Sequence, residues 1–546
     1  MKASDLFIKC LENEGVEYIF GLPGEQNLDI LESLKDSKIK FIVCRDERSA
    51  GFMAATYGRL TGKAGVVMTT LGPGATNLVT AAAYANLGAM PLIMLTGQKA
   101  IKNRKIGHFQ IVNTVEIMDP LTKMAKQLVD AKTIPSLVRD AFKTAEQERP
   151  GAVLLEIPDD IIAEDIEGKP IRRVEQSFPS ADIERIIDDM EIIYTAKRPL
   201  ILIGAGASRT NITGELKNFI DKTGIPFFTT QIGKGVIDER HELHLGTAAL
   251  SANDYIHCAI ERSDLIINIG HDVVEKPPFI MKENGFKVIH INFNSAVFDS
   301  IYFPQLEIVG DIKSSIKELT NRIEKTENWD FTYFKKIKKQ IDEHMLLKIN
   351  EDNFPMIPQR IVNDLRKALP EDSYLCLDNG MYKLWFSRNY RTYFKNTLLL
   401  DNSLATMGAG LPSAIAAKLV NKNKEVICLA GDGGFMMTSH EIETAKRLGL
   451  NLTIIILNDN GYGMIKWEQE ERGFKNFGLE YENPDFIKYA ESFGAKGFRI
   501  DNADKLESTV KKALKEKGIK LIEVPVDYSE NYKFFTKELK EKTCLL

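Results

Sequence analysis

Cysteine and tryptophan are scarce in this chain of 546 residues, which contains six cysteines and three tryptophans. No two cysteines form a CxxC pair, so the sequence argues against a disulfide framework and against a zinc site. Five of the six lie in apolar or amphipathic segments, where a small buried thiol is the usual role. These five are Cys10, Cys44, Cys258, Cys376 and Cys428.

Long apolar runs are missing as well. No stretch approaches the roughly 18 apolar residues that a membrane-spanning helix needs. Residues 1–14 form an amphipathic helical pattern without the apolar core of a signal peptide. The net charge of −5 gives no bias toward nucleic acids or anionic membranes, and the lysine-rich run 335–339 predicts a solvated helix face. We therefore expect a cytoplasmic protein with neither a nucleic acid nor a membrane as its partner.

Short apolar runs alternate with helix-period segments along most of the chain, a pattern typical of parallel α/β sheets. The predicted strands are residues 18–21, 40–43, 65–70, 92–95 and 152–157, then 199–204, 226–229, 265–269, 287–291 and 307–309, and finally 374–377, 425–430, 452–457 and 520–525. Residues 167–179 and 329–354 look like linkers. The predicted fold class is α/β with three doubly wound parallel-sheet domains, at residues 1–166, 185–325 and 355–530, and a tail at 531–546.

Two turns that follow predicted strands carry the strongest chemical signal. The first reads Gly431-Asp432-Gly433-Gly434, after which we expect a helix to begin near Thr438, and the second reads Asp459-Asn460-Gly461-Tyr462. Parallel α/β folds bind ligands at the carboxyl ends of their strands, where glycine turns let backbone amides approach a phosphate. Carboxylate and carbonyl oxygens suit magnesium. Either turn alone could equally be a simple tight turn.

Taken together, the two turns resemble the thiamine-diphosphate signature, in which GDG is followed at a set distance by an Asn or Asp pair. Here 25 residues separate Gly433 from Asp459. The resemblance implies that Asp432 and Asp459 bind magnesium through their side chains and that Gly461 binds it through its carbonyl oxygen. It also implies cofactor contacts from Gly431, Gly433, Gly434 and Tyr462. Asp459 departs from the commoner Asn.

The first third of the chain contains a second signal around Glu47, which follows a predicted strand and precedes a helix rich in small residues. By itself this would be an acid that stabilises a helix start. With the segments 20–24, 57–63 and 72–77, however, it resembles the pyrimidine-binding domain of the acetolactate synthase and pyruvate oxidase superfamily. The resemblance implies that Glu47 activates thiamine diphosphate, that Pro73 and Asn77 lie near the cofactor, and that the site forms between two subunits of a homodimer or homotetramer.

The segment 403–412 resembles the part of this family where a bulky apolar residue bends the cofactor into a V shape, and Met407 occupies that position. Ordinary core packing of a flexible side chain is the alternative. Before the third domain's signature, Asp378-Asn379-Gly380 replaces the usual polar residues of relatives. We expect Asn379 and Gly380 to contact the diphosphate end, chiefly through the backbone.

Two residues bear on the reaction. Gln110, in His108-Phe109-Gln110, resembles the Gln near the substrate oxygens of acetolactate synthases, where an amide can donate to a developing oxyanion. Lys123 resembles their substrate-channel Lys. A surface helix cap is the alternative for Gln110, and for Lys123 a role outside the reaction stays equally open. The segments 484–498 and 524–528 are closest to the catabolic subgroup. The implied reaction decarboxylates pyruvate and joins the remaining hydroxyethyl unit to a second pyruvate, giving 2-acetolactate.

The segment 270–278 lacks the arginines of FAD-binding relatives and resembles the flavin-free catabolic enzymes, so we expect no FAD. The run Gly204–Arg209 is a weak dinucleotide match that favours a structural turn. Three other functions stay open: a related thiamine-diphosphate enzyme that uses another 2-keto acid or acceptor, a non-catalytic paralogue, and, least favoured, a nicotinamide dehydrogenase.

Overall fold

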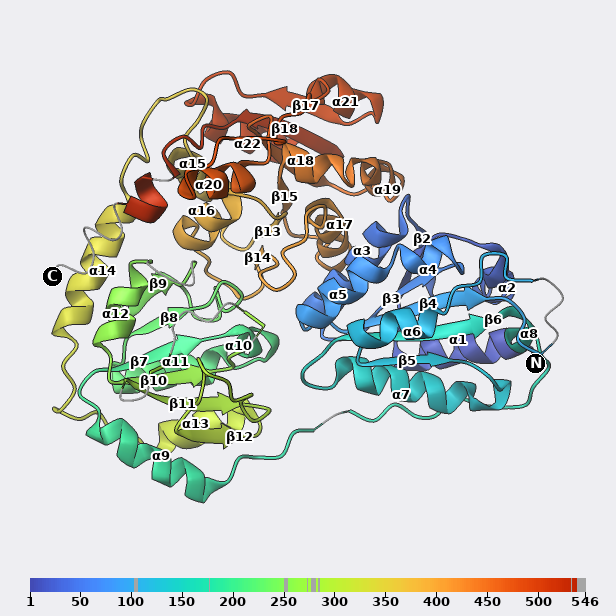
Figure 1. The fold of residues 1–546 in the computed structure, drawn as a ribbon, viewed down its shortest axis with the longest axis horizontal. Helices are drawn as coiled ribbons and strands as arrows, with labels where there is room; N and C mark the ends of the chain where they lie inside the picture. Colours follow the sequence, from blue (N-terminus) through green and yellow to red (C-terminus); the bar gives the residue numbers. More distant parts are fainter. Residues whose placement is uncertain are drawn as a thin grey trace. The chain divides into compact units, whose positions relative to one another are not determined.

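The computed structural model describes residues 1–102, 107–175, 177–249, 254–272, 274–275, 281–282, 285–531 and 533–537. Its strands form three six-stranded sheets (Figure 1). Every ladder in these sheets pairs its strands in parallel. The prediction of an α/β fold with three parallel sheets is therefore confirmed.

The first sheet has the strand order β2-β1-β3-β4-β6-β5. Its strands are β1 (Tyr18–Gly21), β2 (Lys40–Val43), β3 (Gly65–Thr69), β4 (Leu92–Gln98), β5 (Met124–Gln127) and β6 (Ala152–Pro158). Its helices are α1 (Ala3–Glu14), α2 (Leu28–Leu34), α3 (Glu47–Thr61), α4 (Pro73–Thr76), α5 (Val79–Leu87), α6 (Thr114–Met118), α7 (Ile134–Glu146) and α8 (Asp159–Ile162). Apolar side chains from α1, α7 and the central strands form one buried core, and α3 packs against α5 and β3.

The middle sheet has the order β12-β11-β10-β7-β8-β9. Its strands are β7 (Pro199–Ile203), β8 (Phe227–Thr229), β9 (His244–Thr247), β10 (Leu265–Ile269), β11 (Lys287–Asn292) and β12 (Leu306–Val309). Its helices are α9 (Ile183–Thr195), α10 (Ala205–Arg209), α11 (Thr213–Thr223), α12 (Ile256–Arg262), α13 (Ile312–Arg322) and α14 (Thr332–Met345).

Helix α14 corrects one prediction, because it lies inside the stretch 329–354 that we expected to be a linker. Phe334, Ile337 and Ile341 recur at helical spacing and are buried, so this face joins the apolar core of the middle sheet. The lysines between them lie outside that buried face. The solvated helix face predicted for residues 335–339 is thus confirmed.

The third sheet has the order β14-β13-β15-β16-β18-β17. Its strands are β13 (Tyr374–Leu377), β14 (Leu398–Leu399), β15 (Val426–Gly431), β16 (Leu452–Asn458), β17 (Lys496–Arg499) and β18 (Ile519–Pro525). The helices in this last part of the chain are α15 (Pro358–Ala368), α16 (Tyr382–Asn389), α17 (Gly410–Val420), α18 (Asp432–Met436), α19 (Ile442–Arg447), α20 (Gly463–Glu471), α21 (Phe486–Ser492) and α22 (Lys505–Lys515). A short π-helix follows at residues 533–537, where Phe534 and Phe535 are buried against Trp385.

The contacts along the chain define two compact units. Unit 1 contains residues 1–176, 403–423 and 436–450, and unit 2 contains the remainder. Within unit 1, α17 packs on α3, where the hydroxyls of Thr56 and Ser413 share a buried hydrogen bond of 2.9 Å. Segments from the last third of the chain therefore belong to the same unit as Glu47.

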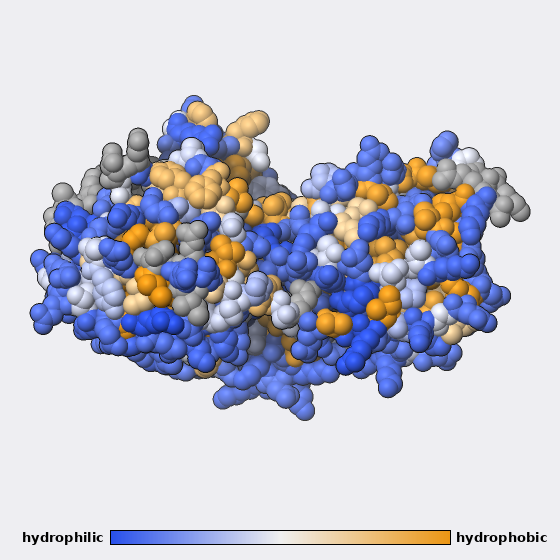
Figure 2. All heavy atoms as spheres, turned by 90° about the horizontal axis from the view of Figure 1, so that it is seen from below, coloured by the Kyte–Doolittle hydropathy of each residue, from blue (hydrophilic) through white to orange (hydrophobic). Residues whose placement is uncertain are grey.

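Cys10, Cys44, Cys376 and Cys428 are buried thiols. Cys258 is buried too, but it is disulfide-bonded, so the expectation of a thiol there was wrong. Among the described residues, no helix combines the length and the apolar character that crossing a bilayer requires. The face drawn in Figure 2 is largely hydrophilic, with its hydrophobic side chains in small separate groups.

Candidate functional site

Glu47 is the first residue of α3, at the carboxyl end of β2. The chain is fixed there because the Asp46 carboxylate accepts a hydrogen bond from the Ser49 amide at 2.9 Å, which caps the helix. Several small residues follow in α3: Ala50, Gly51, Ala54, Ala55 and Gly58. A Cβ atom on Gly58 would lie 2.1 Å from the carbonyl oxygen of Pro91, so only glycine permits this approach. Small residues thus let α3 pack close to the sheet and hold Glu47 at its edge.

The predicted loop 72–77 meets Glu47. Asn77 Nδ2 donates a hydrogen bond to Glu47 Oε2 at 3.0 Å. A Cβ atom on Gly74 would lie 3.5 Å from Glu47 Oε1, so the loop backbone faces the other carboxylate oxygen. Pro73, the first residue of α4, directly precedes Gly74, and its side chain is exposed.

Gln110 lies next to the same loop. Gly72 has a φ of 54°, and a Cβ atom there would approach the Gln110 carbonyl oxygen to 2.8 Å. Gln110 itself has a positive φ of 59° and an exposed side chain. The structure therefore brings Glu47, Asn77 and Gln110 to the carboxyl edge of the first sheet. Residues 103–106 lie outside the described part of the chain.

Lys123 does not join this group within unit 1. It directly precedes β5, and its backbone amide donates to the Ala152 carbonyl at the amino ends of β5 and β6. All strands of the sheet are parallel, so Lys123 lies at the edge opposite Glu47. Lys123 Nζ donates to the Gln147 carbonyl oxygen at 2.7 Å. Desolvation of its ammonium lowers the pKa of Lys123 to about 8.

Met407 lies in the loop before α17, in the part of unit 1 that packs on α3, and its side chain is half-buried. Gly408 follows with a φ of 86°, a conformation that favours glycine. Its carbonyl oxygen accepts a hydrogen bond from Thr438 Oγ1 at 2.9 Å. The backbone of the loop that carries Met407 is therefore tied to Thr438.

In unit 2, Asp432 and Asp459 follow the neighbouring parallel strands β15 and β16. Asp432 is 1% exposed and is the first residue of α18. A short helix that the sequence did not predict thus begins at the turn itself. The helical start predicted near Thr438 is also present, as a 3-10 turn at Ser439–Glu441 that leads into α19. Gly431 ends β15, and Gly433 and Gly434 are residues of α18; at all three positions the neighbouring side chains leave little room for a larger residue.

Glycine is required at these positions because neighbouring groups lie close to the backbone. A Cβ atom on Gly433 would lie 2.6 Å from Tyr481 Oη, and one on Gly434 would lie 2.6 Å from Asp378 Oδ2. On Gly431 it would lie 3.1 Å from the Tyr382 ring. In the second turn, a Cβ atom on Gly463 would approach Asp459 Oδ2 to 2.8 Å. The glycines therefore let tyrosine rings and carboxylates pack directly against the backbone of both turns.

The two carboxylates affect each other electrostatically. Burial raises the pKa of Asp432. Burial and the nearby charge of Asp432 raise the pKa of Asp459 to about 7. Within the described residues, no group of three or more His, Cys, Asp or Glu side chains could hold a metal ion. A cation at this pair would therefore complete its coordination with backbone, phosphate or water oxygens, which is the coordination that magnesium prefers.

Residues near this pair include some that the sequence analysis missed. Asn483 Nδ2 donates to Asp432 Oδ2 at 2.6 Å, and Tyr481 Oη donates to the Gly461 carbonyl oxygen at 3.1 Å. Tyr462 packs edge-on against Tyr481. The motif contained no signal for Asn483 or Tyr481, since they come from the loop after α20. The Pro484-Asp485 helix start beside them was the only local indication.

Asn379 and Gly380 follow β13, which pairs with β15. The Asn379 amide donates to Asp378 Oδ1 at 2.7 Å, and Asp378 also lies against Gly434. A cavity of about 850 Å³ opens on the other side of the site, beside Asp459. Gly461, Tyr462, Lys466, Trp467 and Tyr528 are among its lining residues. The cavity is large enough for a small organic ligand.

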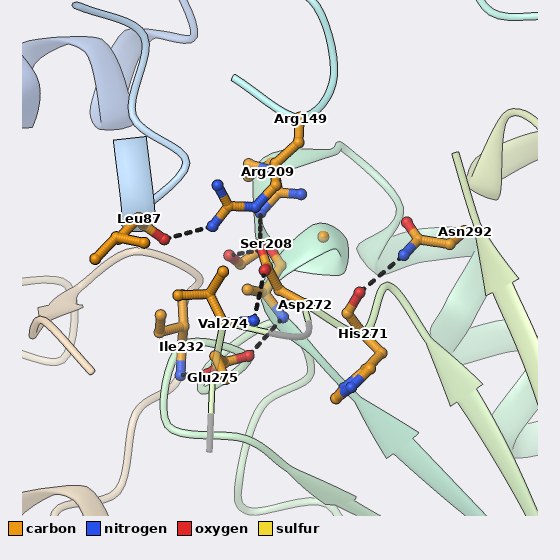
Figure 3. Close-up of polar contacts among 12 residues, drawn as sticks. Leu87, Arg149, Ser208, Arg209, Ile232, His271, Asp272, Val274, Glu275 and Asn292 are labelled. Atoms are coloured by element: carbon orange, nitrogen blue, oxygen red, sulfur yellow. Dashed lines mark hydrogen bonds and ion pairs between the residues drawn. The ribbon is translucent and has the colours of Figure 1, made fainter. Parts of the chain in front are cut away.

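The glycine turn of the middle sheet, Gly204–Arg209, contains α10 (Figure 3). A buried carboxylate fills it: Glu275 accepts hydrogen bonds from the backbone amides of Ala205 at 3.3 Å and Ile232 at 3.2 Å. Arg209 pairs with Asp272 at 3.4 Å. The amide that a dinucleotide phosphate would approach thus already has an acidic partner. Val273 and residues 276–278 of the predicted segment lie outside the described residues.

Comparison with known proteins agrees with this geometry. Three family models match: the thiamine pyrophosphate enzyme N-terminal TPP binding domain at residues 1–117, the central domain at 188–319 and the C-terminal TPP binding domain at 378–524. The chain is also 32% identical to the acetolactate synthase of Bacillus subtilis (strain 168), over 99% of this chain and 96% of that protein. This chain belongs to the acetolactate synthase family of thiamine pyrophosphate enzymes.

Other members of this family show similar values. The catabolic acetolactate synthase of Raoultella terrigena is 33% identical over 97% of this chain and 95% of that protein. The acetolactate synthase large subunit of Lactococcus lactis subsp. lactis (strain IL1403) is 30% identical over 97% and 93%. The resemblance that the two turns and the Glu47 region predicted is therefore confirmed across nearly the whole chain, and the chain is an enzyme of thiamine pyrophosphate type.

Proposed function

We propose that this enzyme is an acetolactate synthase. It converts two pyruvate molecules and one proton into 2-acetolactate and carbon dioxide. The full-length similarity to acetolactate synthases supports this reaction. The observation that carries the proposal is the position of Glu47, an acid at the carboxyl edge of the first sheet that is bound by an amide from the predicted cofactor loop.

In this proposal the cofactor is thiamine diphosphate with Mg²⁺. The donor set fits magnesium, since Asp432 and Asp459 offer carboxylates and Gly461 offers a carbonyl, and the glycine turns after the strands are of the kind that binds a diphosphate. When bound, thiamine diphosphate supplies the carbanion that attacks the keto group of pyruvate. Glu47 holds a proton at the aminopyrimidine ring, and Asn77 orients the Glu47 carboxylate.

The remaining predicted residues have positioning roles. Gln110, beside Gly72, would donate from its side-chain amide to a substrate oxygen as negative charge develops there. Met407 would support the bent cofactor from the loop before α17. Asn379 and Gly380 would contact the diphosphate end beside Gly434. Lys123 remains a predicted channel residue, although its contacts in unit 1 are with the backbone at the opposite sheet edge.

We further propose that the enzyme binds no FAD, works as a homodimer or homotetramer and resides in the cytoplasm. Glu275 supports the absence of FAD. Its carboxylate accepts hydrogen bonds from the backbone amide of Ala205, in the glycine turn that suggested a dinucleotide, and from that of Ile232. An anionic diphosphate at that turn would meet an acid rather than a free donor.

The test is a product assay of the purified enzyme with pyruvate, thiamine diphosphate and Mg²⁺. We expect 2-acetolactate and carbon dioxide in equal amounts. Carbon dioxide without 2-acetolactate would contradict the proposal, and offering a panel of 2-keto acids as second substrates would then identify another acceptor. Absence of Mg²⁺-dependent cofactor binding in calorimetry would instead indicate a non-catalytic paralogue.

A further inference from the structure

Asn483 lies in the loop between α20 and α21. It contacts oxygens at both turns that carry the proposed magnesium ligands Asp432 and Asp459. Its Nδ2 atom lies 2.6 Å from Asp432 Oδ2, 3.2 Å from Asn458 Oδ1 and 3.1 Å from Asn460 Oδ1. An amide nitrogen carries only two hydrogens, so two of the three contacts can be well-directed bonds at one time. The shortest is the charge-assisted bond to Asp432.

The neighbouring groups fix which way the Asn483 amide points. An ionised carboxylate only accepts hydrogen bonds, so the Asn483 nitrogen has to face Asp432. Asn458 is oriented in the same manner: its Nδ2 atom donates to Glu523 Oε1 at 2.8 Å, which turns its Oδ1 atom toward Asn483. Glu523 is in turn held by Arg499 Nε at 2.8 Å. A continuous series of hydrogen bonds therefore leads from Arg499 to Asp432.

The same segment also contacts the second turn. Glu480 forms an isolated antiparallel bridge with Gly461, and Tyr481 Oη donates to the Gly461 carbonyl oxygen. Asn460, between the two ligands Asp459 and Gly461, has a positive φ of 51° and bonds its own amide to Asn458 Oδ1 at 3.2 Å. Residues 480–483 thus touch the second turn at several points.

We propose that Asn483 is a positioning residue for the magnesium–diphosphate site: its amide holds the Asp432 carboxylate and the 458–460 turn in one fixed arrangement. The inference rests on the proposed function of that pair. Magnesium requires near-ideal octahedral geometry, so two ligands on separate strand ends bind it well only if their oxygens are held at a set separation. Asn483 bonds to Asp432 and to Asn458, so a single side chain joins the ends of both strands.

The experiment compares Asn483→Ala and Asn483→Asp with Asn363→Ala as a matched control. Asn363 is likewise half-buried in unit 2 and donates to a carboxylate, that of Asp364 at 3.2 Å, outside the ligand set. Calorimetry measures the Kd of Mg²⁺ at saturating thiamine diphosphate. We expect Asn483→Ala to weaken Mg²⁺ binding about tenfold, the loss of one charge-assisted hydrogen bond, and Asn363→Ala to stay within about twofold.

Asn483→Asp distinguishes a role in positioning the magnesium ligands from a role in stabilising the fold alone. It replaces a donor by an acid beside Asp432, so we expect a lower Tm without Mg²⁺ and a larger rise of Tm on adding Mg²⁺ than in the unaltered enzyme. Equal Tm losses with and without Mg²⁺ in both Asn483 variants, and an unchanged Kd, would overturn the inference.

Asp432→Ala distinguishes a wrong role for Asn483 from a wrong magnesium site. If it abolishes Mg²⁺ binding while Asn483→Ala binds like the unaltered enzyme, only the role of Asn483 is wrong. If Asp432→Ala also binds Mg²⁺ normally, the proposed site itself is wrong and the inference falls with it.

Discussion

Asn77 Nδ2 donates to Glu47 Oε2 across 3.0 Å, and this bond joins two segments that the chain separates by an entire helix and strand. Glu47 begins α3, and Asn77 follows the short helix α4 after β3. A carboxylate that reacts with a bound ring must keep one orientation, and the amide of Asn77 restricts the side chain to it.

Replacing Glu47 by Ala should abolish most of the acetolactate synthase activity. Proton transfer by a positioned acid contributes about 100-fold or more to the rate, so we expect kcat to fall by at least that factor while Tm changes little. Glu32→Ala is the matched control, because Glu32 is an exposed helical acid paired only with Lys35. Retention of pyruvate turnover by Glu47→Ala would contradict the assignment.

Asn77 offers a graded test of the same contact. Asn77→Ala removes one hydrogen bond to a charged group, which predicts a loss of about tenfold in kcat. Asn77→Asp places a second carboxylate at about the same distance from Glu47, so repulsion should lower kcat further than Ala does. The steady-state rates of both variants, measured at saturating cofactor, check the order. Equal losses would show that Asn77 acts only by filling space.

Metal removal should destabilise unit 2 if Asp432 and Asp459 hold Mg²⁺. Binding to the folded state alone adds stability that grows with ligand concentration, about 2.7 kcal/mol at 100 times the Kd. We expect EDTA to lower the Tm of the cofactor-loaded enzyme and Asp459→Ala to lose this response. Asp372→Ala, which alters an exposed acid paired with Lys424, should keep it.

Glu275 predicts a pH dependence of stability. Burial and the nearby Asp272 raise the pKa of this carboxyl to about 7. Between its ordinary pKa of 4.5 and 7 the folded state holds a proton that the unfolded state releases, so this contribution to stability is present at low pH and is lost as the pH rises to 7. The full loss is roughly 3 kcal/mol.

Glu275→Gln removes that titration. Thermal unfolding of both proteins at several pH values from 5 to 8 should show a Tm that falls less with rising pH in the variant. Parallel curves for the two proteins would show that Glu275 keeps an ordinary pKa. Glu371→Gln, at an exposed acid paired with Arg240, is the control for a general loss of charge.

The strands show where prediction from sequence succeeds. Buried central strands such as β10 and β13 were predicted with their observed bounds, because burial on both faces requires a continuous apolar run. The four missed strands, β5, β9, β14 and β17, each lie at the edge of a sheet. An edge strand has one neighbour and can be short or polar, as Lys496–Arg499 is, so it leaves no apolar run to detect.

By itself, the sequence determined the three α/β sheets, the two ligand turns and the acid at the start of α3, since each depends on local patterns of apolar residues, glycines and charge. The tertiary structure decided what lies beside them. It brought Asn77 to Glu47 and Gly72 to Gln110, and it left Lys123 at the opposite edge of the sheet. It also placed Asn483 against Asp432 and Tyr481 against the Gly461 carbonyl oxygen. Contacts between distant segments depend on how strands are ordered in a sheet and how loops pack over its edge, and no local pattern encodes either.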